Sequence, residues 1–268
     1  MAQMTLRDGD HLYYEVHGEG PPLLMVAGLG GMGSFWSEHV PALAKKYQVV
    51  LHDHRGTGKS SPSKIEYSVD QMADDLLQLM DHLDIVRADL VGHSTGGAIG
   101  QTLSIDQPDR IGRLVLSATW TAADGYFKRL FTVRGDILRH GGVEAYVRSH
   151  PVFMFSSSWV RDRFEAIVAG EKTAIASFPN PEIMLSRIRG ILKFDRRDEL
   201  GSITAPTLVI GARDDITTPA YFSEELGRLI PKAKTVILDS GGHFFPIAEA
   251  ESFRKHLLAF LKKTPAPS

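Results

Sequence analysis

Cysteine is absent from this chain of 268 residues, which excludes disulfide bonds, a thiolate metal site and a cysteine nucleophile. The sequence also lacks an excess of either charge: 30 Lys and Arg residues face 32 Asp and Glu residues, for a formal net charge of −2. That balance argues against nucleic-acid binding. Apolar runs fall short of the roughly 18 residues that a membrane span needs, and the N-terminal stretch does not have the pattern of a signal peptide. We therefore expect a cytoplasmic protein without a membrane or nucleic-acid partner.

Short apolar runs without alternation recur along the chain, and they are typical of strands buried on both faces. Strands are predicted at residues 4–7, 11–16, 23–27, 49–51, 88–91, 113–118, 206–211 and 234–239. Helical periodicity between them predicts helices at residues 68–83, 95–107, 220–230 and 249–262. Strand alternating with helix indicates an α/β fold, in which a mostly parallel sheet carries helices on both faces.

Residues 119–205 interrupt this alternation, because the 87 positions between two predicted strands are far more than a βα connection needs. Helical patterns within the segment fall at residues 127–139, 143–149, 159–169 and 182–193. We therefore expect a helical cap at 119–205, inserted into a core formed by residues 1–118 and 206–268. The prolines of residues 262–268 predict a frayed end.

The segment Gly92-His93-Ser94-Thr95-Gly96 fits the pattern G-x-S-x-G and lies directly after a predicted strand and before a predicted helix. In that context the chain must turn sharply, and the two glycines allow neighbouring backbone to approach. The turn lifts the serine hydroxyl above the sheet edge, next to the free N–H groups of a helix N-terminus. Ser94 is therefore the candidate nucleophile, while the alternative is a plain Gly/Ser turn with Ser94 as a helix cap.

A serine hydroxyl needs a base, and the base needs an orienting carboxylate. His243 is the candidate base because it follows the last predicted strand; its rivals near the site are His52, His54 and His93. Two adjacent aspartates, Asp214 and Asp215, follow the strand at 206–211. The order Ser, Asp, His is the one associated with α/β-hydrolases, and we favour Asp215 as the acid. Asp214 is the competing choice, otherwise interpreted as a turn or capping residue near the helix that follows.

An oxyanion hole needs two N–H donors. We expect one from Thr95, directly after the candidate nucleophile, and one from Leu29 in the loop Gly28-Leu29-Gly30-Gly31. Glycines let that loop backbone come near a substrate. The loop does not match the spacing of a phosphate-binding loop or of a dinucleotide fingerprint.

Together these residues resemble the α/β-hydrolase superfamily over nearly the whole chain. The matching segments are the glycine-rich loop at 28–31, Asp53-His54-Arg55-Gly56-Thr57-Gly58-Lys59-Ser60, the elbow at 92–96, Asp215 to Pro219, and Gly242-His243. The resemblance implies an eight-stranded sheet with a helical cap after strand 6. It also implies an acid four residues before a proline, which is Asp215 before Pro219. The usual His-Gly of the oxyanion loop reads Ala27-Gly28 here, so the side-chain support of that loop must differ.

Within the superfamily, the chain is similar to the proteins assigned as aminoacrylate hydrolases of bacterial pyrimidine utilisation, and to 3-oxoadipate enol-lactonases. The stretches similar to the first group are residues 28–36, 47–50, 55–58, 68–73 and 141–145, whereas the enol-lactonases are similar in size and overall pattern. Members of the first group can lack the elbow serine, whereas this chain keeps Ser94, which favours acyl transfer by a working triad.

The cap holds 13 Lys and Arg residues against 10 Asp and Glu residues, which hints at an anionic substrate. Arg187 and Arg189 are candidate carboxylate ligands, and Trp36 and Trp120 are candidate pocket walls. For each of the four, a solvated or core position is the alternative.

The sequence therefore predicts a serine hydrolase that cleaves a small ester, lactone or amide-like acyl compound, with no metal or organic cofactor. One alternative keeps the fold but uses the His–Asp pair for carbon–carbon bond hydrolysis or cofactor-free base chemistry. A second is a non-catalytic member that binds a small ligand. We expect a monomer or a homodimer acting on a small molecule.

Overall fold

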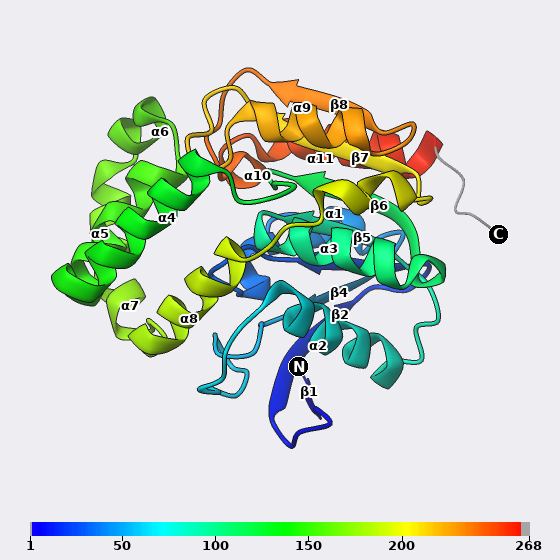
Figure 1. The fold of residues 1–268 in the computed structure, drawn as a ribbon, viewed down its shortest axis with the longest axis horizontal. Helices are drawn as coiled ribbons and strands as arrows, with labels where there is room; N and C mark the ends of the chain where they lie inside the picture. The colour runs from blue at the N-terminus through cyan, green and yellow to red at the C-terminus, as the bar shows by residue number, and fades with distance from the viewer. Residues whose placement is uncertain (1, 264–268) are drawn as a thin grey trace.

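A computed structural model describes residues 2–263, and its centre is one sheet of eight strands in the order β1-β2-β4-β3-β5-β6-β7-β8 (Figure 1). The strands are β1 (Ala2–Thr5), β2 (His11–His17), β3 (Pro22–Val26), β4 (Gln48–His52), β5 (Ala88–His93), β6 (Ile111–Ser117), β7 (Thr207–Ala212) and β8 (Lys234–Leu238). The predicted strands are all present, with bounds shifted by a few residues. The expectation of fraying falls mainly on residues 264–268, outside the described part of the chain.

Most of the sheet is parallel, as predicted. Only β1 with β2 and β2 with β4 pair antiparallel, and every pair from β4 across to β8 is parallel. Every residue of β5, β6 and β7 is buried, because helices cover both faces of the sheet there. Continuous apolar runs are the sequence signature of such strands.

Two hydrophobic clusters lie on opposite faces of the sheet. Helices α2, α3 and α9 contribute to one cluster, and α1, α10 and α11 contribute to the other. These helices are α1 (Val40–Leu43), α2 (Val69–His82), α3 (Thr95–Asp106), α9 (Ala220–Leu229), α10 (Phe245–Ala248) and α11 (Ala250–Lys263). The prediction missed α1, α10 and the 3₁₀ segments η1 (Gly33–Trp36), η2 (Pro108–Arg110) and η4 (Arg197–Ser202), because helical segments of three to six residues are too short to show periodicity.

Five α-helices lie between β6 and β7, beside the carboxyl ends of the strands (Figure 1). They are α4 (Gly125–Asp136), α5 (Gly142–Met154), α6 (Ser157–Asp162), α7 (Phe164–Ala176) and α8 (Pro181–Leu192), with the π-turn η3 (Ile137–Gly141) after α4. Two expectations need correction. The helix α5 continues through Pro151 instead of ending at residue 149, and the helix expected at 159–169 is divided at Arg163. We keep the name cap for residues 119–205.

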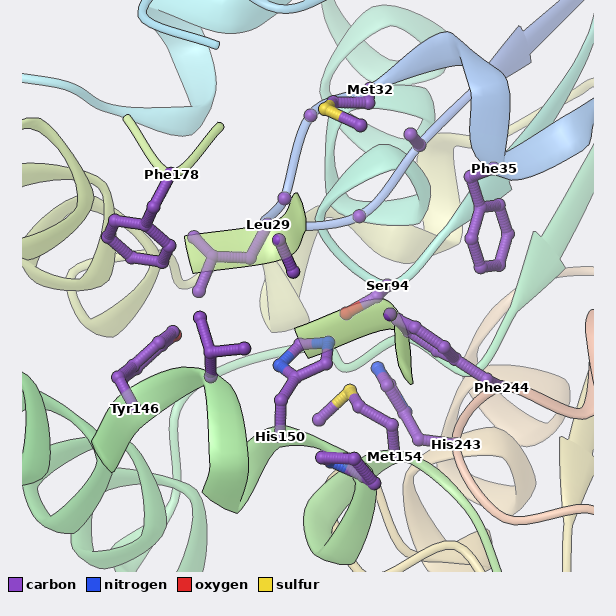
Figure 2. A pocket seen from close by; sticks show the side chains of 18 of the residues that line it. Leu29, Met32, Phe35, Ser94, Tyr146, His150, Met154, Phe178, His243 and Phe244 are labelled. Carbon is purple, nitrogen blue, oxygen red and sulfur yellow. The ribbon is translucent and has the colours of Figure 1, made fainter. Parts of the chain in front are cut away.

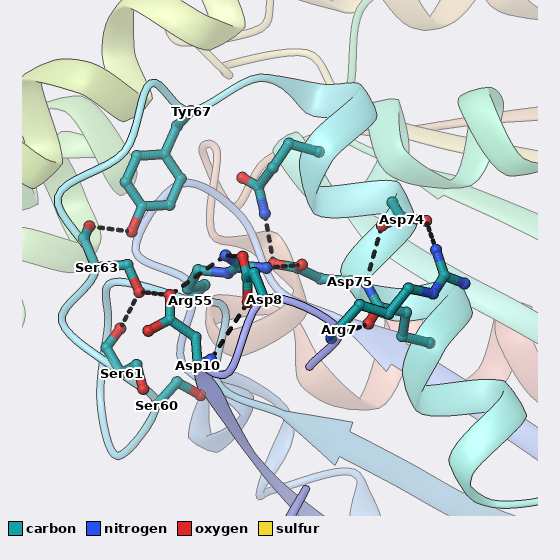
Figure 3. A network of polar contacts seen from close by, with 12 residues as sticks. Arg7, Asp8, Asp10, Arg55, Ser60, Ser61, Ser63, Tyr67, Asp74 and Asp75 are labelled. Carbon is teal, nitrogen blue, oxygen red and sulfur yellow. Dashed lines mark hydrogen bonds and ion pairs between the residues drawn. The ribbon is translucent and has the colours of Figure 1, made fainter. Parts of the chain in front are cut away.

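Arg55 ties three segments of the core together (Figure 3). Its guanidinium contacts Asp75 of α2 at 2.5 Å, and it also pairs with Asp8 and Asp10 in the β1–β2 turn. Burial raises the pKa of Asp75 to about 6, although Arg55 works in the opposite direction. This network holds the segment after β4 in place, next to the cap helix α8.

Within the part of the chain that the structure describes, no helix combines the length and apolar character needed to cross a membrane.

Candidate active site

Ser94 occupies a strained turn between β5 and α3. Its backbone has φ 53° and ψ −117°, a region that residues with a side chain rarely adopt. The Ser94 amide donates to the Ser117 carbonyl oxygen of β6 at 2.8 Å, which fixes the turn to the sheet. The side chain lies at the wall of a large cavity (Figure 2). This geometry is the strand-to-helix elbow that the sequence predicts.

Gly92 and Gly96 are required by close backbone approach. A Cβ atom on Gly92 would lie 2.1 Å from the Gly96 carbonyl oxygen, and one on Gly96 would lie 2.2 Å from the Val26 carbonyl oxygen. Such distances are far below van der Waals contact, so neither position accepts a side chain without movement of the backbone. The two glycines therefore allow β5, α3 and the end of β3 to meet beneath Ser94.

His243 follows β8 and lines the same cavity as Ser94. Its Nδ1 donates to Asp215 Oδ2 at 2.9 Å, and both side chains are buried. Asp215 also accepts from the amides of Thr217 and Thr218 and from the Thr218 hydroxyl, at 2.7–2.9 Å. With Nδ1 occupied as a donor, the other ring nitrogen, Nε2, is left as the proton acceptor.

The two adjacent aspartates have different partners. Asp214 accepts from the amides of Gly241 and Gly242, at 3.2 and 2.9 Å, and so holds the loop that precedes His243. Asp215 contacts the imidazole itself. Asp214 therefore caps the loop before His243, and its partners do not belong to the helix that follows it in sequence, α9.

The other histidines near the site are held neutral by burial. Burial lowers the pKa of His93 well below its usual value, with a further contribution from His243. Its Nδ1 lies 3.2 Å from the Ser117 hydroxyl, and its ring stacks on Phe35. Burial lowers the pKa of His52 to about 4, and that of His54 is also well below normal. Only His243, among these candidates, combines a carboxylate partner with a place on the cavity wall.

The amides of Leu29 and Thr95 face no acceptor among residues 2–263. Thr95 is the first residue of α3, and Leu29 lies in the glycine-rich loop that lines the cavity beside Ser94. A Cβ on Gly28 would lie 3.2 Å from Ser94 Cβ, so glycine lets this loop approach the serine closely. Both amides are thus available to a substrate oxygen.

Arg187 supports the Leu29 loop and lies outside the cavity wall. The side chain is fully buried, and its Nε donates to the Leu29 carbonyl oxygen at 3.1 Å. Its other nitrogens donate to the Arg55 carbonyl oxygen and to His54 Nδ1, at 3.1 and 2.9 Å. The expectation that Arg187 binds substrate needs correction, because protein acceptors already take its donors. Ala27 stands where the usual histidine of this loop would be, and the cap residue Arg187 supplies side-chain support to the loop instead.

The cavity has a volume of about 680 Å³ and is walled mainly by apolar side chains of the cap and of the oxyanion loop (Figure 2). Its aromatic walls are Phe35, Phe131, Tyr146, Trp159, Phe178 and Phe244. The expected walls Trp36 and Trp120 are instead core residues: Trp36 stacks on Phe253, and Trp120 packs on Phe127. Arg189 is exposed on α8, away from the cavity lining. The structure therefore also contradicts the predictions that Trp36, Trp120 and Arg189 line the pocket.

The loop of His243 is joined directly to the cap. The Phe244 amide donates to the Met154 carbonyl oxygen, at the end of α5, at 2.7 Å. A Cβ on Gly242 would lie 2.8 Å from the backbone carbon of Phe155, so the two segments are in close contact. The sequence also gave no signal for two polar cap residues in the cavity wall, Arg134 and His150.

Comparison with known proteins agrees with this architecture. The family model for the alpha/beta hydrolase fold matches residues 21–250. A protein of Azorhizobium caulinodans named "Putative carbamate hydrolase RutD" is 39% identical over 249 residues, which are 93% of this chain and 94% of that protein. A protein of Caulobacter vibrioides with the same name is 37% identical over 268 residues, covering 98% of this chain and 99% of that protein.

Among solved structures, the enol-lactonase of Burkholderia xenovorans LB400 superposes with a TM-score of 0.89 at 28% identity, covering 98% of this chain and 100% of that one. The resemblance to these hydrolase groups and the predicted fold class are thus confirmed. The chain belongs to the family of α/β-hydrolase enzymes.

Proposed function

We propose that this hydrolase cleaves a small ester, lactone or amide-like acyl compound through a triad of Ser94, His243 and Asp215. The observation that carries the proposal is the Asp215–His243 hydrogen bond of 2.9 Å, which leaves His243 Nε2 as an acceptor in the cavity that Ser94 also lines. An imidazole held in that tautomer is what a serine nucleophile requires.

The reaction needs only these side chains and water. His243 Nε2 takes the proton of Ser94 Oγ while Oγ attacks the carbonyl carbon, and the amides of Leu29 and Thr95 stabilise the resulting oxyanion. The intermediate collapses, and the leaving oxygen or nitrogen receives the proton from His243. Water, deprotonated by the same nitrogen, then attacks the acyl-enzyme and releases the acid and Ser94. In a lactone the leaving oxygen remains attached to the acyl chain.

The size of the cavity bears on the substrate. Its volume of about 680 Å³ lies within the usual range for organic ligands of many heavy atoms. Carbamate itself, the compound in the relatives' name, would fill a small part of it. We therefore infer a substrate with an extended acyl or leaving group that contacts the apolar cap walls.

Intact-mass analysis after treatment with a small fluorophosphonate tests the proposal. We expect a single adduct on the wild-type protein and none on Ser94→Ala, and Ser94→Ala should also lose turnover of small aryl esters. A folded wild-type protein that neither takes up the phosphonate nor hydrolyses an ester would overturn the proposal, and would favour base chemistry by His243 alone.

A further inference from the structure

His150 brings a second imidazole to the cavity, from the cap helix α5 (Figure 2). Its ring lies 5.6 Å from the ring of Phe244, which lies 5.9 Å from the ring of His243. The two histidines therefore flank one aromatic side chain, and His150 faces the space beside Ser94. The triad proposed above does not use this residue.

Arg134 determines which nitrogen of His150 carries the proton. The Arg134 Nη2 lies 3.2 Å from His150 Nδ1 and 2.9 Å from the Tyr146 hydroxyl. A guanidinium only donates hydrogen bonds, so Nδ1 must accept, and the neutral ring carries its proton on Nε2. Burial, with the positive charge of Arg134, lowers the pKa of His150 to about 3, so the ring is neutral at pH 7. No acceptor for this Nε2–H is present among residues 2–263.

Arg134 is itself a buried cation without an anion. The side chain is 3% exposed and lines the cavity, and over residues 2–263 no carboxylate lies within ion-pair distance of it. Its Nε is buried and has no hydrogen-bond partner in that range. The rings of Phe131, Tyr146 and Phe153 lie 5.3–5.5 Å from its guanidinium carbon, whereas buried charges in proteins are normally paired with an opposite charge.

Arg187 differs from Arg134 in its hydrogen bonds. Arg187 is also buried without a carboxylate, but each of its nitrogens reaches an oxygen or a ring nitrogen of the protein. The acidic residue in the cavity wall is Glu171. Its Oε2 lies 3.6 Å from Nε of Arg148, which is its ion-pair partner. Arg134 therefore has unused donor capacity and positive charge next to a cavity whose walls are mainly apolar.

We propose that Arg134 and the Nε2–H of His150 form a subsite for a carboxylate on the substrate, separate from the carbonyl that Ser94 attacks. The proposal rests on the hydrolase function proposed above and adds its substrate class: acyl compounds that carry a second, anionic group. The anion would accept from His150 Nε2–H, and Arg134, on the other side of the imidazole, would stabilise its charge and hold the ring in the tautomer that donates from Nε2. The aromatic walls would hold the carbon chain between the two ends.

Two aryl esters of equal size test this subsite: 4-nitrophenyl hydrogen adipate, which ends in a carboxylate, and its primary amide, which is neutral. We expect the wild-type enzyme to have the higher kcat/KM for the carboxylate. Arg134→Gln should lower the ratio of the two kcat/KM values about 10- to 100-fold, mainly through KM, because the positive charge next to His150 is lost. A ratio measured within one variant is unaffected by partial loss of folded protein.

Further variants separate binding from structure. His150→Phe should lower the ratio, and His150→Gln, which restores an N–H donor, should recover part of it. Arg129→Gln makes the same charge change at an exposed position of α4, and should leave the ratio at the wild-type value. An equal ratio in the wild type, Arg134→Gln and Arg129→Gln would overturn the subsite while the hydrolase proposal stands.

A binding measurement covers the case in which neither ester is hydrolysed. Calorimetric titration of Ser94→Ala with adipate should show binding that is weakened at least about tenfold when Arg134→Gln is added. Equal binding to both proteins, or none to either, would overturn the subsite. Absence of ester turnover together with absence of phosphonate labelling would overturn the hydrolase proposal instead, so the two failures are distinguishable.

Discussion

Arg187 Nε donates a hydrogen bond to the Leu29 carbonyl oxygen at 3.1 Å, which joins the cap helix α8 to the loop of the proposed oxyanion hole. The peptide plane between Leu29 and Gly30 is thereby oriented from the cap, and the Leu29 amide belongs to the adjoining plane. The same guanidinium lies 5.4 Å from the ring centre of Tyr67 and reaches His54, so it is fixed on several sides. A cap residue thus contributes to the geometry around Ser94 without lining the cavity.

We predict that Arg187→Gln lowers kcat about 10- to 100-fold on a small neutral ester, with a smaller effect on KM. The reason is that a misplaced Leu29 amide weakens transition-state stabilisation, and loss of one oxyanion donor typically costs about 10²–10³ in kcat. Steady-state kinetics on thermally characterised protein measure this. Arg189→Gln, at an exposed position of the same helix, serves as control. A rise in KM with unchanged kcat would contradict the prediction.

The two aspartates provide a second test. Asp215→Asn should lower kcat by about 10³–10⁴, because an amide no longer holds the required imidazole tautomer. Asp214→Asn should act through the Gly241-Gly242 loop and cost less than tenfold, with a lower thermal midpoint. Steady-state kinetics measure kcat of both variants, and thermal unfolding measures their midpoints. Equal losses in kcat would mean that the role assigned to Asp215 is wrong.

The glycines of the elbow give a prediction for stability. Gly96→Ala places Cβ 2.2 Å from the Val26 carbonyl oxygen, so backbone must shift. We expect the free energy of unfolding to fall by about 1–3 kcal/mol, together with reduced phosphonate labelling of Ser94. Urea denaturation measures the first effect and mass spectrometry the second. Gly125→Ala, where a Cβ meets no heavy atom within 4 Å, should leave both near wild-type values.

Buried histidines predict a pH dependence of stability. Burial lowers the pKa of His52 to about 4 and that of His150 to about 3, and also depresses those of His54 and His93. The unfolded chain, with histidine pKa values near 6.5, therefore binds more protons between pH 4 and 6.5. Stability from these groups is complete above about pH 6.5 and is lost as the pH falls below it.

Each such histidine lowers the free energy of unfolding by at most about 1.4 kcal/mol for each pH unit that the pH falls within that window. Asp75 opposes them: its pKa is raised to about 6, so it favours the folded state as the pH falls from 6 towards 4. Four histidines outweigh one carboxyl, and we expect a clear loss of stability between pH 7 and pH 5 in urea titrations. His52→Gln should reduce the slope of the free energy of unfolding against pH. A free energy of unfolding that does not change with pH in the wild type would contradict this prediction.

The sequence predicts the fold because its signals are local. Continuous apolar runs mark the buried strands, and the Gly-x-Ser-x-Gly pattern between strand and helix marks Ser94. The lining of the cavity depends instead on which side of a short element faces inward. Phe35 and Trp36 are neighbours in a one-turn helix, yet Phe35 lines the cavity and Trp36 lies in the core. Composition likewise does not distinguish Arg134 from Arg187, because packing of α4 and α8 decides which one meets the cavity.

The hydrogen bond from Phe244 to Met154 has a consequence for the exchange of caps between related enzymes. The residue that follows the proposed base is attached to the backbone of α5, so a graft with a different end to that helix would displace His243 as well as the substrate. A change of cap would therefore alter the shape of the cavity and the position of the proposed base together. An engineered cap must reproduce a backbone carbonyl at position 154 before its new side chains can be judged.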